Sequence, residues 1–84
     1  MAMKGRVAAL NPNRGMIAIE TDYFGYTIIE GDCSDFEIDD LVAWERDTGL
    51  GGQEYSNLTR QRTLSVFVQN HWVPKTQVRQ QLLL

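Results

Sequence analysis

Cysteine, histidine and long apolar runs are scarce in this sequence. Cys33 is the only cysteine, so no disulfide can form within the chain, a composition typical of the reducing cytoplasm. No apolar run approaches the roughly 20 residues that a membrane-spanning helix needs. Turn residues follow the N-terminal bases too early for a signal peptide. These absences lead us to expect a cytoplasmic protein without a membrane partner.

Residues that bind metals or carry out catalysis are also few. One cysteine and one histidine cannot build a zinc site, and the acids lack the spacing of a calcium loop. No nucleophile, base and orienting residue are arranged around His71 in the sequence. Gly49-Leu50-Gly51-Gly52 lacks the lysine of a phosphate-binding loop. We therefore expect no catalytic residues, no metal and no cofactor, and hence a protein that is not an enzyme.

The 84 residues are enough for one domain with one small core. All eleven acids lie between residues 20 and 54, where Arg46 is the single base. The remaining bases lie before and after this acidic middle. If the first and last strands are neighbours, the protein has a basic face and an acidic face. The alternative is an ordinary solvated surface.

Alternating apolar residues between turn signals predict an all-β fold. An Asn-Pro-Asn-Arg-Gly cluster predicts the turn of the first hairpin. Five strands are expected at about residues 3–10, 15–21, 26–30, 41–45 and 63–69, with turns that include residues 22–25. Residues 47–59 show no clear periodicity and are expected to form a long loop. The predicted core consists of Val7, Ile17, Ile19, Val42, Trp44, Val66 and Val68.

The end of the chain has a different pattern. Pro74 suits the first position of a helix, and Val78 and Leu82 have the i, i+4 spacing of one helical face. We expect a barrel over residues 1–70 and a short C-terminal helix within 71–84 that packs on it, forming a single domain. The alternative is a helix that binds a partner.

Five short strands with a long third connection suggest a small five-stranded Greek-key barrel of the OB type. The spacing Gly5-x-Val7-x-x-x-Asn11-x-x-x-Gly15-x-x-x-Ile19 resembles the opening of the bacterial cold-shock domain. Residues 39–44 are similar to a later strand of that family, and the resemblance covers roughly residues 4–68. The whole chain also resembles small bacterial proteins with a cold-shock-like barrel. The resemblance implies single-stranded nucleic-acid binding, with bases stacked on aromatic residues of the first three strands.

The stacking positions differ from the family. Its strand-one tryptophan falls at Ala9, and the phenylalanines of its first ribonucleoprotein motif fall at Met16 and Ala18. The second motif falls near residues 26–29, which contain one aromatic residue, Tyr26, and no histidine. Three aliphatic platform positions predict binding that is weak and mainly electrostatic.

Two functions follow as hypotheses. The first is binding of single-stranded RNA or DNA, with Tyr23, Phe24, Tyr26, Phe67 or Trp72 as displaced stacking residues. The second is a non-catalytic protein–protein interaction module, which contacts its partner through the Met16 face, the acidic middle or the C-terminal helix. The predicted nucleic-acid-binding residues are Lys4, Arg6, Arg14, Met16, Tyr26, Arg60 and Arg62.

Overall fold

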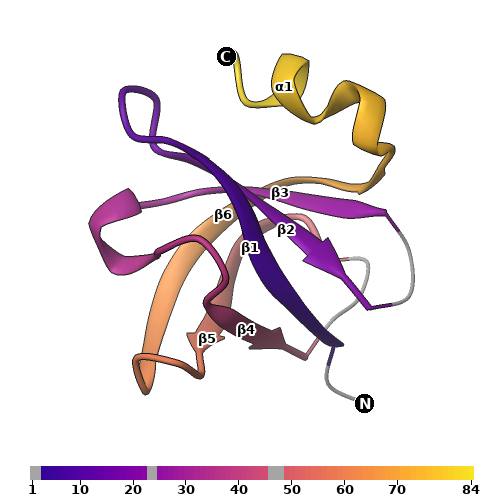
Figure 1. Cartoon of the computed structure of the whole chain (residues 1–84). Helices are drawn as coiled ribbons and strands as arrows, with labels where there is room; N and C mark the ends of the chain where they lie inside the picture. The colour runs from indigo at the N-terminus through magenta and orange to yellow at the C-terminus, as the bar shows by residue number, and fades with distance from the viewer. Residues whose placement is uncertain (1–2, 23–24, 46–48) are drawn as a thin grey trace.

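The computed structural model describes residues 3–22, 25–45 and 49–84, so residues 23 and 24 of the second predicted turn lie outside it. Within these residues six strands form a barrel with a short C-terminal helix, which confirms the expected fold class (Figure 1). The strands are β1 (Met3–Asn11), β2 (Met16–Thr21), β3 (Tyr26–Glu30), β4 (Leu41–Trp44), β5 (Gly51–Asn57) and β6 (Arg62–Val73). The 3-10 turns η1 (Cys33–Asp35) and η2 (Lys75–Gln77) precede β4 and the helix α1 (Val78–Gln81), respectively.

The strands are arranged around the barrel in the order β1-β2-β3-β6-β5-β4, and β4 returns to β1. The segment β4-β1-β2-β3 is the predicted Greek key. Every neighbouring pair is antiparallel. The prediction of five strands was wrong. Strand direction must alternate around an antiparallel ring, so a closed ring of this kind needs an even number of strands.

The additional strand, β5, lies in the segment that was predicted to be a loop. Gly51 and Gly52 begin this strand, and glycine is depleted in strands because it has no side chain to pack. Pairing with β6 along the whole strand compensates, from Gly51 opposite Val68 to Asn57 opposite Arg62. Tertiary pairing therefore forms a strand that the local sequence does not indicate.

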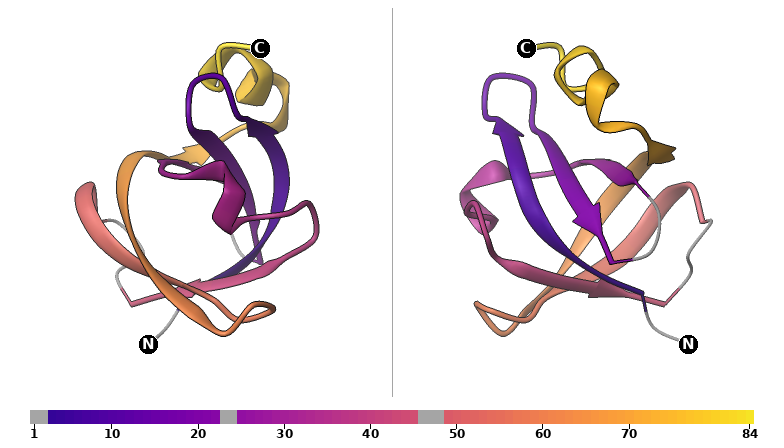
Figure 2. Two further views of the ribbon diagram at one scale, coloured as in Figure 1. Left: turned by 90° about the vertical axis from the view of Figure 1, so that its left-hand side faces the viewer. Right: turned by 45° about the vertical axis from the view of Figure 1, so that its right-hand side comes forward.

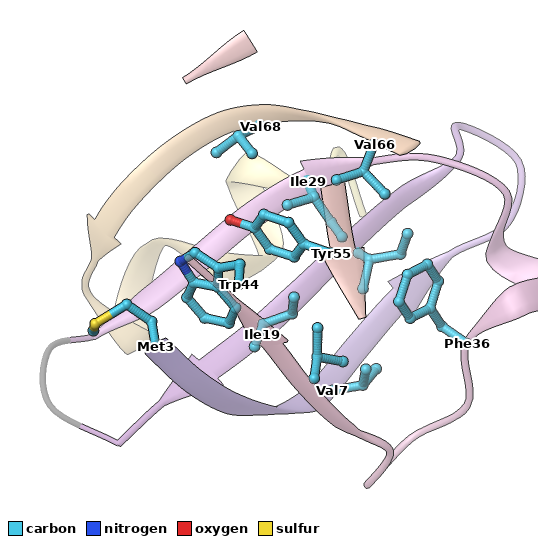
Figure 3. Packing of buried hydrophobic residues seen from close by; sticks show 11 residues of the cluster. Met3, Val7, Ile19, Ile29, Phe36, Trp44, Tyr55, Val66 and Val68 are labelled. Atoms are coloured by element: carbon cyan, nitrogen blue, oxygen red, sulfur yellow. The ribbon is translucent and has the colours of Figure 1, made fainter. Parts of the chain in front are cut away.

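The barrel interior contains the seven predicted core residues, which confirms their placement. Val66 and Val68 point inward from β6, while Phe67 between them is half exposed. Two aromatic rings lie at the centre of the barrel (Figure 3). Trp44 stacks on Tyr55 with parallel ring planes and 4.7 Å between the ring centroids. The complete cluster is Met3, Val7, Ile17, Ile19, Ile29, Phe36, Val42, Trp44, Tyr55, Val66 and Val68.

A second apolar cluster lies outside the barrel. The C-terminal segment, residues 74–84, follows β6 and lies beside the β1–β2 hairpin, at the opposite end of the molecule from the start of β1 (Figure 2). Val78 and Leu82 are buried in this cluster together with residues of the first three strands. Its buried members are Met16, Ala18, Tyr26, Ile28, Val73, Val78 and Leu82, with Ala9 packed against them.

Candidate binding surfaces

The C-terminal segment covers the outer face of the first three strands. Met16, Ala18 and Tyr26 are buried in one cluster with residues of this segment. The Asn11 side chain donates a buried hydrogen bond to the Leu82 carbonyl, with 2.7 Å between nitrogen and oxygen. The predicted binding residues Met16 and Tyr26 therefore support the C-terminal segment and present little surface to a nucleic-acid base.

This covering accounts for the aliphatic residues at the three positions where the cold-shock resemblance implies aromatic rings. Ala9, Met16 and Ala18 have small or flexible side chains and belong to the same packed cluster as Leu82, which is fully buried. Aromatic rings at these positions would occupy the space of the segment. The aliphatic residues that distinguish this chain from the cold-shock pattern therefore lie where residues 74–84 cover the face.

Arg60 and Arg62 form ion pairs with the acidic connection between β3 and β4. Arg60 lies 2.8 Å from a carboxylate oxygen of Glu37 and 3.3 Å from one of Asp40. Arg62 lies 3.0 Å from a carboxylate oxygen of Asp35. The connection thus folds back onto the turn between β5 and β6. Both arginines are charge-compensated, so a phosphate would have to compete with these carboxylates.

Asp40 is the buried centre of this network. One of its carboxylate oxygens accepts hydrogen bonds from the Glu37 backbone at 3.0 Å and from the Asn57 side chain at 2.9 Å. Asn57 is fully buried and also donates to the Asp35 carbonyl at 3.0 Å. Shared acceptors of this kind fix the β3–β4 connection against the end of β5.

Lys4, Arg6 and Arg14 remain exposed on β1 and its turn. In the part of the chain that the structure describes, none of the three forms an ion pair. Arg6 donates one hydrogen bond, to the Asp39 carbonyl at 3.3 Å. Lys4 and Arg6 line a cavity of about 180 Å³ with Gly5, Asp22, Leu41, Val42 and Leu58. The predicted basic residues are therefore divided between an open group and a paired group.

Two of the aromatic residues considered for stacking are exposed. Phe67 is 50% exposed and Trp72 is 58% exposed, both on β6. Tyr23 and Phe24 lie outside the described residues. Neither Phe67 nor Trp72 belongs to the first three strands, so their stacking surface would differ from the one that the cold-shock resemblance implies.

A surface that sequence reasoning missed lies along β4 and β5. Among the described residues these strands pair at two positions, Val42 with Asn57 and Ala43 with Ser56. Beyond this point a cavity of about 510 Å³ is lined by residues of β5 and β6 and by Glu45, which directly follows β4. We call this opening the β4–β5 seam, lined by Glu45, Gly52, Gln53, Glu54, Ser65 and Val66. No local signal could locate it, because β5 itself was not predicted.

His71 and Cys33 have structural partners. The buried His71 ring lies 2.9 Å from the Thr27 hydroxyl through Nδ1 and 2.8 Å from the Gly49 carbonyl through Nε2, and Nε2 donates to that carbonyl. Burial, followed by the nearby Asp32, raises the pKa of the Cys33 thiol and disfavours the reactive thiolate. Within the described ranges, no three histidine, cysteine or acidic residues are grouped to hold a metal ion.

No protein-family model, curated protein or solved structure matches this chain. In the described part of the chain, no helix has the length and apolar character required to cross a bilayer. The binding surfaces above therefore carry the functional argument.

Proposed function

We propose that this protein is a non-catalytic protein-interaction module built on a Greek-key barrel. One observation carries the proposal: the face on which a cold-shock-like barrel would stack bases is covered by residues 74–84 of the same chain. The covering buries an apolar cluster and a hydrogen-bonded amide, so removing it would expose apolar surface to water. Binding through another face of the barrel requires no such opening.

The charges support the same proposal. The chain has a net charge of −3, and the two arginines on the β5–β6 side are paired with acids. Glu45 and Glu54 remain exposed beside the β4–β5 seam. An acidic surface repels the phosphates of nucleic acids and attracts basic segments of proteins.

The test is an NMR titration of the full chain with short blocked peptides that are basic, neutral or acidic. We expect saturable shifts of defined amide resonances with the basic peptides at physiological salt. The same experiment with a mixed-sequence single-stranded oligonucleotide is the comparison. Saturable binding of the oligonucleotide with no response to any peptide would overturn the proposal.

A second candidate is weak binding of single-stranded RNA or DNA, and the exposure of Lys4, Arg6 and Arg14 favours it. Three cations outside ion pairs, without a stacking platform, support a dissociation constant of roughly 1–100 µM at physiological salt. The double variant Lys4→Ala, Arg14→Ala should make the dependence of log K on log salt concentration shallower. The slope should fall in magnitude by about 0.7 for each phosphate that the protein no longer neutralises. Arg62→Ala is the control and should leave the slope unchanged, because Arg62 is paired with Asp35. No binding at low salt would exclude this candidate.

A further inference from the structure

Two cations of β1 lie beside two exposed leucines on the outer surface of the barrel. Lys4 and Arg6 are two residues apart and both exposed, so their side chains leave the same face of the strand. Arg6 is opposite Leu41 of β4, and the Leu41 carbonyl accepts a hydrogen bond from the Leu58 N–H at 2.7 Å. Figure 1 shows β4 beside the lower half of β1. We call this surface the β1–β4 strip, which consists of Lys4, Arg6, Leu41 and Leu58.

The four side chains of the strip line one cavity of about 180 Å³. Leu41 and Leu58 are each 43% exposed, so both present apolar surface to the solvent beside the cations. Small-molecule sites usually have volumes of about 300–1,000 Å³ and enclose most of their ligand, so this cavity better fits a side chain of a larger partner. The strand neighbours of Lys4 and Arg6 on both sides are described residues, so the strip is defined without a gap.

The charges around the strip are arranged in rows. Among the described residues neither Lys4 nor Arg6 forms an ion pair. Their nearest acids in register lie on the β2 side, with Glu20 opposite Arg6 and the Asp22 N–H bonded to the Lys4 carbonyl at 3.2 Å. The Glu20 carboxylate accepts a hydrogen bond from the Tyr26 hydroxyl at 3.2 Å. The cations therefore have acids on one side and leucines on the other.

This arrangement favours a protein segment over a nucleic acid. A nucleic acid carries a negative charge at every nucleotide, and the carboxylates of Glu20 and Asp22 repel such a continuous line of charge. Leucine side chains also lack the flat faces on which bases stack. A polypeptide can place one or two carboxylates opposite the cations and an apolar side chain against the leucines.

We propose that the β1–β4 strip binds an acidic, leucine-containing segment of a partner protein, whose carboxylates contact Lys4 and Arg6 and whose apolar side chain packs against Leu41 and Leu58. This inference rests on the proposed function and adds a second site to the module. The acidic surface attracts basic segments, whereas the strip attracts acidic ones. Opposite charge supplies selectivity, and burial of apolar area supplies affinity that salt does not screen.

The experiment uses the full chain, labelled with ¹⁵N and with ¹³C in the leucine methyl groups, and a blocked peptide of the sequence serine-glutamate-leucine-aspartate-leucine-serine. We expect saturable shifts of the Leu41 and Leu58 methyls and of the amides of residues 4–6. The methyls of Leu82, which is fully buried in the outer cluster, are the internal reference and should not move. A peptide with lysine at both acidic positions should shift the strip resonances with an affinity at least about fivefold weaker.

Charge reversal tests the two cations. The double variant Lys4→Glu, Arg6→Glu should reverse the preference, so that the lysine peptide binds the strip better than the acidic peptide. Arg14→Glu with Lys75→Glu is the matched control, since it makes the same change of charge at exposed residues outside the strip, and it should retain the acidic preference. The same preference in both double variants would overturn the inference.

Removal of apolar surface tests the leucines. Leu41→Ala should weaken binding of the acidic peptide about threefold or more, because less apolar area is buried against the peptide. Leu84→Ala is the matched control, since Leu84 is 53% exposed and lies outside the strip, and it should change the affinity by less than about twofold. Equal affinities of the two variants would show that the leucines do not contact the peptide and would overturn the inference.

Other results separate this inference from the proposed function. Saturable shifts with basic peptides elsewhere on the protein, and none at the strip with the acidic peptide, would refute the inference and leave a protein-interaction module. No response to any peptide would refute both. A single-stranded oligonucleotide that shifts the strip resonances at lower concentration than the acidic peptide would assign the strip to nucleic acid and overturn the inference. Strip resonances that shift with protein concentration alone, together with a dimer in sedimentation equilibrium, would assign the strip to a second copy of the chain and also overturn it.

Discussion

The Asn11 side-chain amide donates to the Leu82 carbonyl across 71 residues of sequence, with 2.7 Å between the two atoms. This bond joins the end of β1 to the last turn of the chain. Leu82 also fills the outer apolar cluster with its side chain, so the same residue is held by a polar and an apolar contact. The C-terminal segment is therefore a part of the fold that closes the face of β1–β3.

Asn11→Ala removes this bond and leaves the Leu82 carbonyl buried without its donor. We expect a loss of about 1–3 kcal/mol in the free energy of unfolding. Asn13→Ala, an exposed residue of the same hairpin turn, is the control and should change stability by less than about 0.5 kcal/mol. Urea unfolding measures both, and equal midpoints for the two variants would show that the bond contributes nothing.

The buried Asp40 and the exposed Glu37 both pair with Arg60, and this difference in burial predicts different energies. Asp40→Ala should cost about 2–4 kcal/mol, because the Glu37 N–H, the Asn57 amide and the Arg60 guanidinium lose a shared acceptor. Glu37→Ala should cost less than about 1 kcal/mol, since the Glu37 carboxylate is largely in water. Thermal or urea unfolding of the two variants gives the comparison, and similar losses would contradict the burial argument.

Much of the barrel could be predicted from local pattern. The alternation of Val66 and Val68 around Phe67 defines the inner face of β6, and the hairpin turn before Gly15 separates β1 from β2. β5 could not be predicted, because its glycines and polar residues adopt a strand only through pairing with β6. β6 also continues to Val73, where the apolar alternation is weaker and pairing with β3 maintains the strand.

The candidate site was less accessible to sequence reasoning, because its determinants are pairs distant in the chain. The arginines were identified, but Arg62 pairs with Asp35, which is 27 residues away. A signal for the covered face was present: Ala9, Met16 and Ala18 replace aromatic residues, while Val78 and Leu82 form an apolar face in the tail. Only the structure shows that these two features lie against each other.

Tyr55→Phe tests the Tyr55 hydroxyl in the core, which has no hydrogen-bond partner among the residues that the structure describes. Removing this buried hydroxyl should raise the free energy of unfolding by about 1–2 kcal/mol at neutral pH. The reason is that folding of the variant no longer includes the cost of taking the hydroxyl out of water. Phenylalanine retains the ring stacked on Trp44. Urea unfolding at neutral pH checks this increase, and a loss of stability would show that the hydroxyl has a favourable interaction inside the barrel.

The same substitution predicts a change in pH dependence. Burial raises the pKa of the Tyr55 hydroxyl above its ordinary value, so its contribution to stability is fully present below the unfolded pKa of about 10. Above that pH the unfolded state loses its proton first, and stability falls by up to about 1.4 kcal/mol per pH unit. Tyr55→Phe should flatten this alkaline loss, with a remainder from Tyr26, whose pKa is also raised by burial. An unchanged alkaline slope in urea unfolding would contradict the assignment.

Ala18→Phe places a ring where a cold-shock-like barrel would stack a base. Ala18 is fully buried against the C-terminal segment, so the ring overpacks the outer cluster, and we expect a loss of about 1–3 kcal/mol. The displaced segment should then exchange its amide hydrogens faster at Leu82, Leu83 and Leu84, whose amides bond within this turn. Ala8→Phe is the matched control, because Ala8 is exposed on the neighbouring strand β1 and should be tolerated within about 0.5 kcal/mol. Unfolding and hydrogen exchange followed by NMR give both readouts, and an Ala18→Phe variant with unchanged stability and protection would show that residues 74–84 do not hold the β1–β3 face closed.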